Sequence, residues 1–157
     1  MDALAALARA LTRAVVGAPV ELPRALVDQY PELARARWRQ GGLPPRVGGW
    51  ALGRRTAAAI TLWRTVYLAP GVRLSADLLL HELGHVRQFE ATPAFAVRYL
   101  LESLRRGYRD NRYEHDAEAY ARALLGRAGR LADARGAGAA GGADGSGRAG
   151  ESLPQDG

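Results

Sequence analysis

The stretch "LLLHELGHVRQFE" (78–90) carries two of the three histidines of this 157-residue chain, four positions apart, with a glutamate directly after the first. In an α-helix, residues i and i+4 lie on one face, so the imidazoles of His81 and His85 can reach the same metal ion. Glu82 is turned by about 100° around the helix from His81, so its carboxylate can lie beside the ion and act on a water molecule without binding the ion. The stretch therefore predicts a helix that holds zinc, with Glu82 as general base.

The residues around this stretch predict that the helix is capped and buried. Ser75 is a favourable N-cap, Asp77 suits the first turn, and apolar residues at 78–80, 83 and 86 would bury the helix. Gly84 costs roughly 1 kcal/mol relative to alanine inside a helix, which indicates a close approach by another backbone or by a substrate. The competing interpretation is an ordinary surface or core helix in which the two histidines are incidental.

A zinc site of this kind needs a third protein ligand and leaves a fourth position for water. Gln88 and Ala91 stand where metzincin proteases have glycine and histidine, so that class is excluded. The sequence contains no cysteine, which also excludes thiolate ligands, iron–sulfur clusters and disulfides. The third ligand is therefore sought in "YEHDAEAYA" (113–121).

The candidates for the third ligand in this segment are Glu114, Glu118 and His115. By their spacing, the two glutamates share one helical face with Ala117 and Ala121. The small alanine side chains would let this helix approach the histidine-bearing helix closely. His115 points about 100° away from Glu114. Glu114 is the favoured ligand, and Glu118 and His115 are the alternatives.

On these residues, the segment 43–126 resembles the gluzincin superfamily of zinc metallopeptidases, and it is also similar to small bacterial proteins described as zinc peptidases. The resemblance implies that Glu114 completes a site for Zn²⁺. It also implies that Glu118, where aspartate is more usual, supports a histidine ligand. Arg87 departs from the pattern, which has an apolar residue at that position.

The fold implied by this resemblance is an α+β minimal zincin, mostly helical, with a small antiparallel sheet and the metal between two helices. The implied function is hydrolysis of peptide bonds in a peptide or protein substrate. In such folds the strand before the metal-binding helix commonly holds substrate as an added strand, which points to "RTVYLAP" (64–70). Tyr99, Tyr108 and Tyr113 are candidate donors to an oxyanion, and the sequence does not choose among them.

The remaining sequence predicts further elements of secondary structure. β-Branched and aromatic residues predict two antiparallel strands at 57–62 and 65–69. Helices are expected after Pro23, at 31–40, at 93–108 and at 111–125, and a glycine- and proline-rich loop is expected at 41–49. We expect the helix at 93–108 to pack on the core with its arginines reaching solvent, the alternative being a lid or a membrane-surface helix.

The two ends of the chain differ from the zinc-peptidase-like domain predicted at 23–127. An amphipathic helix that covers the core is predicted at 1–22, with peripheral membrane contact as the alternative, from apolar residues at helical spacing: Leu4, Leu7, Leu11 and Val15. Residues 128–157 are rich in glycine and alanine, which predicts a disordered tail. Neither a signal peptide nor a run of ~18 apolar residues is evident, which favours a cytoplasmic location.

Positive charge is concentrated in the N-terminal third of the chain. Residues 1–56 hold nine of the 22 arginines against four acidic residues, whereas residues 57–126 hold nine against eight. No nucleic-acid-binding motif accompanies this charge, so a solvated arginine-rich face is favoured over a nucleic-acid or anionic-membrane surface. The alternatives to a zinc peptidase are a zinc-retaining binding or regulatory module and a basic-surface interaction protein.

Overall fold

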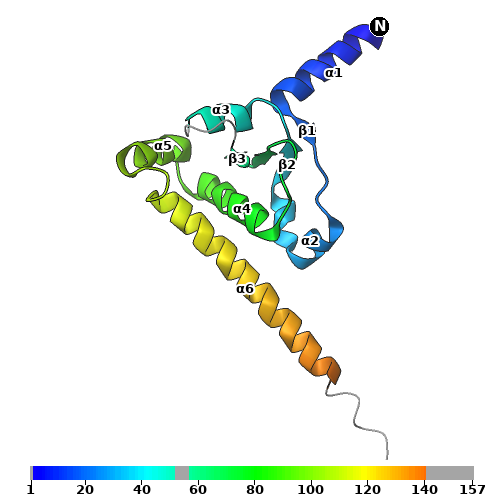
Figure 1. Ribbon diagram of the computed structural model, residues 1–157, viewed down its shortest axis with the longest axis vertical. Helices are drawn as coiled ribbons and strands as arrows, with labels where there is room; N and C mark the ends of the chain where they lie inside the picture. Colours follow the sequence, from blue (N-terminus) through cyan, green and yellow to red (C-terminus); the bar gives the residue numbers. More distant parts are fainter. Residues whose placement is uncertain (1, 52–56, 141–157) are drawn as a thin grey trace, which may run out of the picture.

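The computed structural model describes residues 2–51 and 57–140 of the chain (Figure 1). Helices predominate, and a small sheet lies among them, which confirms the predicted α+β class. The order of elements is α1 (Asp2–Val16), β1 (Ala18–Pro19), α2 (Arg24–Gln29), the 3₁₀ helix η1 (Pro31–Arg35), β2 (Arg37–Gln40), α3 (Pro44–Ala51), β3 (Ala59–Leu62), β4 (Thr65–Leu68), α4 (Ala76–Ala91), α5 (Phe95–Arg106) and α6 (Arg112–Ala140).

The sheet has four strands in the order β1-β2-β4-β3, so β3 forms one edge. The antiparallel pairing of β3 with β4 confirms the predicted hairpin, whose two-residue turn is Trp63-Arg64. Trp63 has a φ of 59°, a conformation that glycine usually supplies at the first position of such a turn. β2 pairs in parallel with β4. The sheet is therefore small, as predicted, but mixed, because one of its three pairings is parallel.

Two segments differ from their predicted secondary structure. The helix expected at 31–40 is instead η1 followed by β2. Trp38 accounts for the change, because its ring is buried and its Nε1 donates a hydrogen bond to the Leu33 carbonyl oxygen at 2.9 Å. Tertiary packing here overrides the local preference. The loop expected at 41–49 contains helix α3, whose first residue is Pro44, and proline is favoured at the first position of a helix.

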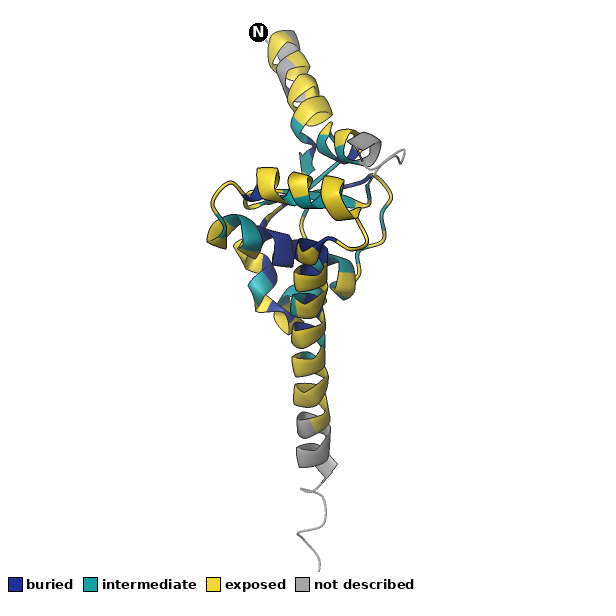
Figure 2. Cartoon of the chain, turned by 90° about the vertical axis from the view of Figure 1, so that its left-hand side faces the viewer, coloured by how far each residue is buried: buried dark blue, intermediate teal, exposed yellow. Residues whose placement is uncertain are grey.

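The hydrophobic core lies between the sheet, η1 and the helices α4 and α6. α4 begins after Ser75, whose hydroxyl oxygen accepts a hydrogen bond from the Leu78 N–H at 3.3 Å, as predicted for the N-cap. Figure 2 shows the buried residues gathered at the centre of the molecule. The fully buried apolar side chains include Leu33, Val66, Leu68, Leu79, Leu80, Leu83 and Val86. Four of these belong to α4, which packs against the sheet, η1 and α6.

Helix α6 is longer than predicted. It runs from Arg112 to Ala140, so the part of the expected disordered tail at 128–140 is helical, which corrects that prediction. Ala128 still packs against the core, and Arg127 forms an ion pair with Glu32, whereas the side chains of residues 129–133 are exposed. Residues 141–157 of the predicted tail lie outside the described residues. The predicted domain boundaries stay predictions.

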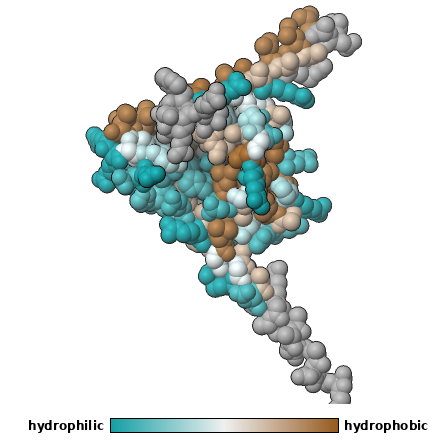
Figure 3. All heavy atoms as spheres, in the orientation of Figure 1, coloured by the Kyte–Doolittle hydropathy of each residue, from teal (hydrophilic) through white to brown (hydrophobic). Residues whose placement is uncertain are grey.

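Two amphipathic helices leave apolar side chains in solvent, contrary to expectation. In α1, the four apolar residues that were expected to cover the core are 50–76% exposed: Leu4, Leu7, Leu11 and Val15. In α5, Phe95 is buried, but most of the apolar face is exposed: Val97, Leu100, Leu101 and Leu104. Figure 3 shows the apolar surface of α1 at the upper right. No helix among residues 2–51 and 57–140 combines the length and apolar character needed to cross a membrane.

Several arginines of the basic N-terminal third make structural contacts. Arg35 donates to the Glu90 carboxylate at 3.0 Å, which ties η1 to α4. Arg39 donates to the carbonyl oxygens of Val16 and Gly17 at 2.7 and 3.0 Å, which holds the end of α1 against β2. Two further arginines of this third, Arg54 and Arg55, lie outside the described residues. Part of the positive charge therefore stabilises the fold.

Candidate metal centre

The two helices that carry the candidate ligands, α4 and α6, pack in direct backbone contact. A Cβ added at Gly84 would lie 2.9 Å from Ala117 Cα and 3.0 Å from Ala117 Cβ, closer than carbon atoms normally approach. Ala117 and Ala121 are both buried. The prediction that Gly84 marks a close backbone approach and that the alanines permit it is confirmed. This contact brings Glu114 of α6 opposite His81 and His85 of α4.

These three side chains form a compact triangle of metal-binding atoms. The Nε2 atoms of His81 and His85 lie 3.2 Å apart, His81 Nε2 lies 3.3 Å from Glu114 Oε2, and His85 Nε2 lies 3.2 Å from Glu114 Oε1. Two ligands at the usual zinc distances of about 2.0–2.1 Å and at the tetrahedral angle are separated by about 3.3–3.4 Å. The triangle therefore has the dimensions of one face of a zinc coordination tetrahedron. His81, His85 and Glu114 together can hold a metal ion.

The charge in the centre also favours a cation. Burial alone would raise the pKa of Glu114, but the hydrogen bonds with His81 and His85 hold that pKa well below its usual value, so the carboxylate is ionised. Burial alone would lower the pKa of His85, but its hydrogen bond to Glu114 and the negative charge of Glu82 raise it. Two buried carboxylates thus face two imidazoles in a small volume. A metal cation satisfies this donor set.

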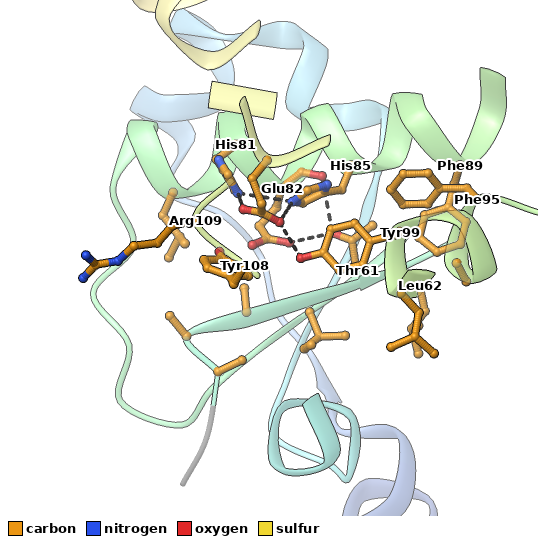
Figure 4. Close-up of a pocket in the computed structure, with 18 of the residues that line it drawn as sticks. Thr61, Leu62, His81, Glu82, His85, Phe89, Phe95, Tyr99, Tyr108 and Arg109 are labelled. Atoms are coloured by element: carbon orange, nitrogen blue, oxygen red, sulfur yellow. Dashed lines mark hydrogen bonds and ion pairs between the residues drawn. The ribbon is translucent and has the colours of Figure 1, made fainter. Parts of the chain in front are cut away.

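The side chain of Glu82 lies beside the triangle and is not part of it. It is 6% exposed, and its Oε2 accepts a hydrogen bond of 2.7 Å from the Thr61 hydroxyl on β3. Figure 4 shows Glu82 between the two imidazoles and Thr61. Glu82 therefore lies next to the ligand triangle and outside it, and its role as a base stays a prediction. Thr61 itself was missed, because its proximity to α4 depends on strand pairing that no local pattern specifies.

Gln88 fixes the orientation of His85. Its Nε2 donates to the Tyr113 carbonyl oxygen at 2.7 Å, so its Oε1 must be the atom that lies 2.8 Å from His85 Nδ1. A carbonyl oxygen can only accept, so His85 donates from Nδ1, and in the neutral ring this leaves the lone pair of Nε2 facing the triangle. This is the tautomer that a metal ligand needs. The orienting role of Gln88 was not predicted from the sequence, where this residue was used only to exclude the metzincin class.

The structure does not bring the other two candidates to the centre. Glu118 has a side chain that is 60% exposed and lies 3.7 Å from Arg122 of the next turn, so the supporting role expected of it is corrected and falls to Gln88. His115 is exposed, and its Nε2 lies 2.8 Å from the Arg109 carbonyl oxygen, which takes it away from the triangle. Of the alternatives for the third ligand, Glu114 is the one whose carboxylate meets both histidines.

Among the three candidate tyrosines, Tyr99 of α5 reaches the centre. Its hydroxyl donates to Glu114 Oε1 at 2.6 Å. Burial and the negative charge of Glu114 raise the pKa of Tyr99, so its phenol stays protonated and remains a donor. Asn111 supports this arrangement, because its Nδ2 donates to the Tyr99 carbonyl oxygen and its Oδ1 accepts from the Tyr113 N–H at the start of α6. Asn111 is fully buried and was also missed from the sequence.

The centre opens into a cleft of about 860 Å³. One wall is the edge strand β3 with the residues before it, and the facing side is formed by α5 and the turn at 106–109. Figure 4 shows apolar side chains at the end of the cleft next to His85 and polar ones at the end next to His81. Leu62, Phe89 and Phe95 form the first group, and Tyr108 and Arg109 form the second.

No family model, curated protein or solved structure matches the chain. The resemblance to gluzincins therefore stays a prediction from the sequence. What the site can do follows from the geometry of the ligand triangle, the adjacent carboxylate and the cleft.

Proposed function

We propose that the protein is a zinc-dependent peptidase. In this proposal His81, His85 and Glu114 hold Zn²⁺, and Glu82 is the general base. When bound, the ion supplies a Lewis acid that lowers the pKa of water and polarises a carbonyl. The observation that carries the proposal is the buried Glu82 carboxylate beside the triangle, facing the cleft. A carboxylate in that place can accept a proton from water as the water attacks a substrate.

A catalytic centre fits this arrangement better than a structural one. Structural zinc sites usually have four protein ligands and are closed, whereas catalytic sites have three and keep a position open. The described residues supply three ligands here, and the cleft reaches all of them. A structural site also has no use for a second buried carboxylate next to the ion. Tyr99, as a protonated donor at the centre, adds a group that can stabilise developing negative charge.

The edge strand β3 supports an extended peptide as substrate. The segment expected to receive substrate, 64–70, contains β4, which is paired on one side with β2 and on the other with β3, so that expectation was wrong. The Ala69 N–H bonds to the Ala58 carbonyl oxygen at 2.8 Å. Because hydrogen-bonded pairs alternate along an antiparallel ladder, the backbone groups of Ala59 and Thr61 face outward from β4. A peptide can pair with them along the cleft.

The experiment that tests the proposal compares Glu82→Gln with wild-type protein, using an unstructured protein such as casein as substrate. We expect Glu82→Gln to keep one zinc per chain while its turnover falls by about 10²- to 10⁴-fold, because only the proton acceptor is lost. Glu90→Gln is the matched control, since Glu90 lies on the same helix but forms surface ion pairs with Arg35 and Arg64. It should keep both zinc and turnover.

Other outcomes have definite meanings. Loss of zinc from Glu82→Gln would make Glu82 a ligand. Full turnover by Glu82→Gln would refute the proposed mechanism. Wild-type protein that binds zinc but cleaves no peptide or protein substrate would be a zinc-retaining binding module.

A further inference from the structure

We propose that Thr61 is a positioning residue that holds the Glu82 carboxylate in place from the edge strand. The inference rests on the proposed function of Glu82 as general base. The Thr61 Oγ1 lies 2.7 Å from Glu82 Oε2 and 3.3 Å from the Glu82 carbonyl oxygen. A hydroxyl carries one proton, and the shorter contact has the usual length of an O–H···O hydrogen bond. The bond therefore goes to the carboxylate.

The bond constrains a side chain that otherwise rotates. The terminal torsion of a glutamate side chain is broad, so a buried carboxylate without a partner samples many orientations. The Thr61 hydroxyl engages Oε2 and leaves Oε1 as the oxygen that accepts a proton from water. A base that is held in the productive orientation transfers protons more effectively than one that must first rotate into that orientation. The contribution of Thr61 therefore acts on the chemical step and not on metal binding.

Thr61 also links the base to the strand that faces the cleft. Its side chain bonds to Glu82, while its backbone N–H and C=O belong to the positions of β3 that face away from β4. A peptide paired with β3 would thus contact the same residue that holds the base. This arrangement fixes the distance between a bound peptide and the Glu82 carboxylate.

Substitution of the hydroxyl separates this role from a structural one. Thr61→Val keeps the shape of the side chain and the β-branch that suits a strand, but it removes the donor. We expect kcat to fall by roughly 10- to 100-fold, the loss of one hydrogen bond to a charged group, with KM and zinc affinity little changed. Thr61→Ser retains a donor and should recover most of the lost turnover. Thr65→Val, on the neighbouring strand β4, is the control and should behave like wild-type protein.

A second measurement needs no turnover, so it separates failure of this inference from failure of the proposed function. In metal-free protein, Thr61→Val should lower the melting temperature by roughly 4–8 °C. In a Glu82→Ala background the same substitution should have a much smaller effect, because its acceptor is already gone. Equal effects in both backgrounds would overturn the inference. Loss of zinc from Thr61→Val, or failure of Thr61→Ser to recover turnover, would also overturn it, by showing a structural role.

Discussion

Replacement of Gly84 by alanine tests the helix contact that assembles the metal centre. The added Cβ would lie 2.9 Å from Ala117 Cα, and ordinary van der Waals contact begins at 3.4 Å, so the helices would have to separate by 3.4 − 2.9 = 0.5 Å. The atom it meets belongs to the backbone, so no rotamer change relieves the contact. Overpacking of this kind costs about 1–3 kcal/mol, and alanine regains about 1 kcal/mol of helix propensity. We expect a net loss of about 0–2 kcal/mol.

The same shift should impair the metal site. Metal–ligand distances tolerate deviations of about 0.2 Å, and Glu114 sits on the helix that would move. Zinc affinity should therefore fall by at least about 10-fold. Gly129→Ala is the matched control, because nothing lies within 4 Å of a Cβ added there, and it should stabilise α6 by about 0.5–1 kcal/mol.

The assays are urea denaturation of the metal-free variants and zinc titration against a competing chelator. The reasoning would be refuted if Gly84→Ala stabilised the protein as much as Gly129→Ala and bound zinc with unchanged affinity.

Three further predictions concern individual contacts. Glu114→Ala should weaken zinc binding by more than about 100-fold, whereas Glu118→Ala should leave it unchanged in the same chelator titration; the reverse result would make Glu118 the third ligand. Gln88→Ala should lower zinc affinity by about 10- to 100-fold, because it frees the ring of His85, and unchanged affinity would contradict the orienting role. A chain that ends after Gly129 should keep its melting temperature and its zinc, because the side chains of 129–133 are exposed; unfolding on truncation would place the tail in the core.

The metal centre was largely predictable because its parts are local. The i, i+4 spacing of the histidines, the cost of Gly84 and the small residues around Glu114 are all properties of single helices, and each carried over to the structure. Glu118 shows the limit of such reasoning. It is spaced to share a helical face with Glu114, but its side chain is exposed and lies beside Arg122, so it does not reach the centre.

The residues that were missed depend on contacts between distant segments. Thr61 reaches Glu82 because β3 is the edge strand next to α4. β3 lies at the edge because β2 pairs in parallel with the other side of β4. β2 itself lies in a segment where a helix was expected. The exposed apolar faces of α1 and α5 were missed for a related reason. Periodicity indicates that a helix has an apolar face but does not indicate what covers it.

The zinc content of the purified protein tests the central claim most directly. Protein freed of metal by a chelator, supplied with zinc and then passed over a desalting column should retain one zinc per chain by elemental analysis. Under the same conditions His81→Ala should retain little or none, because it lacks one of the three ligands. Wild-type protein that retained no zinc would contradict the account.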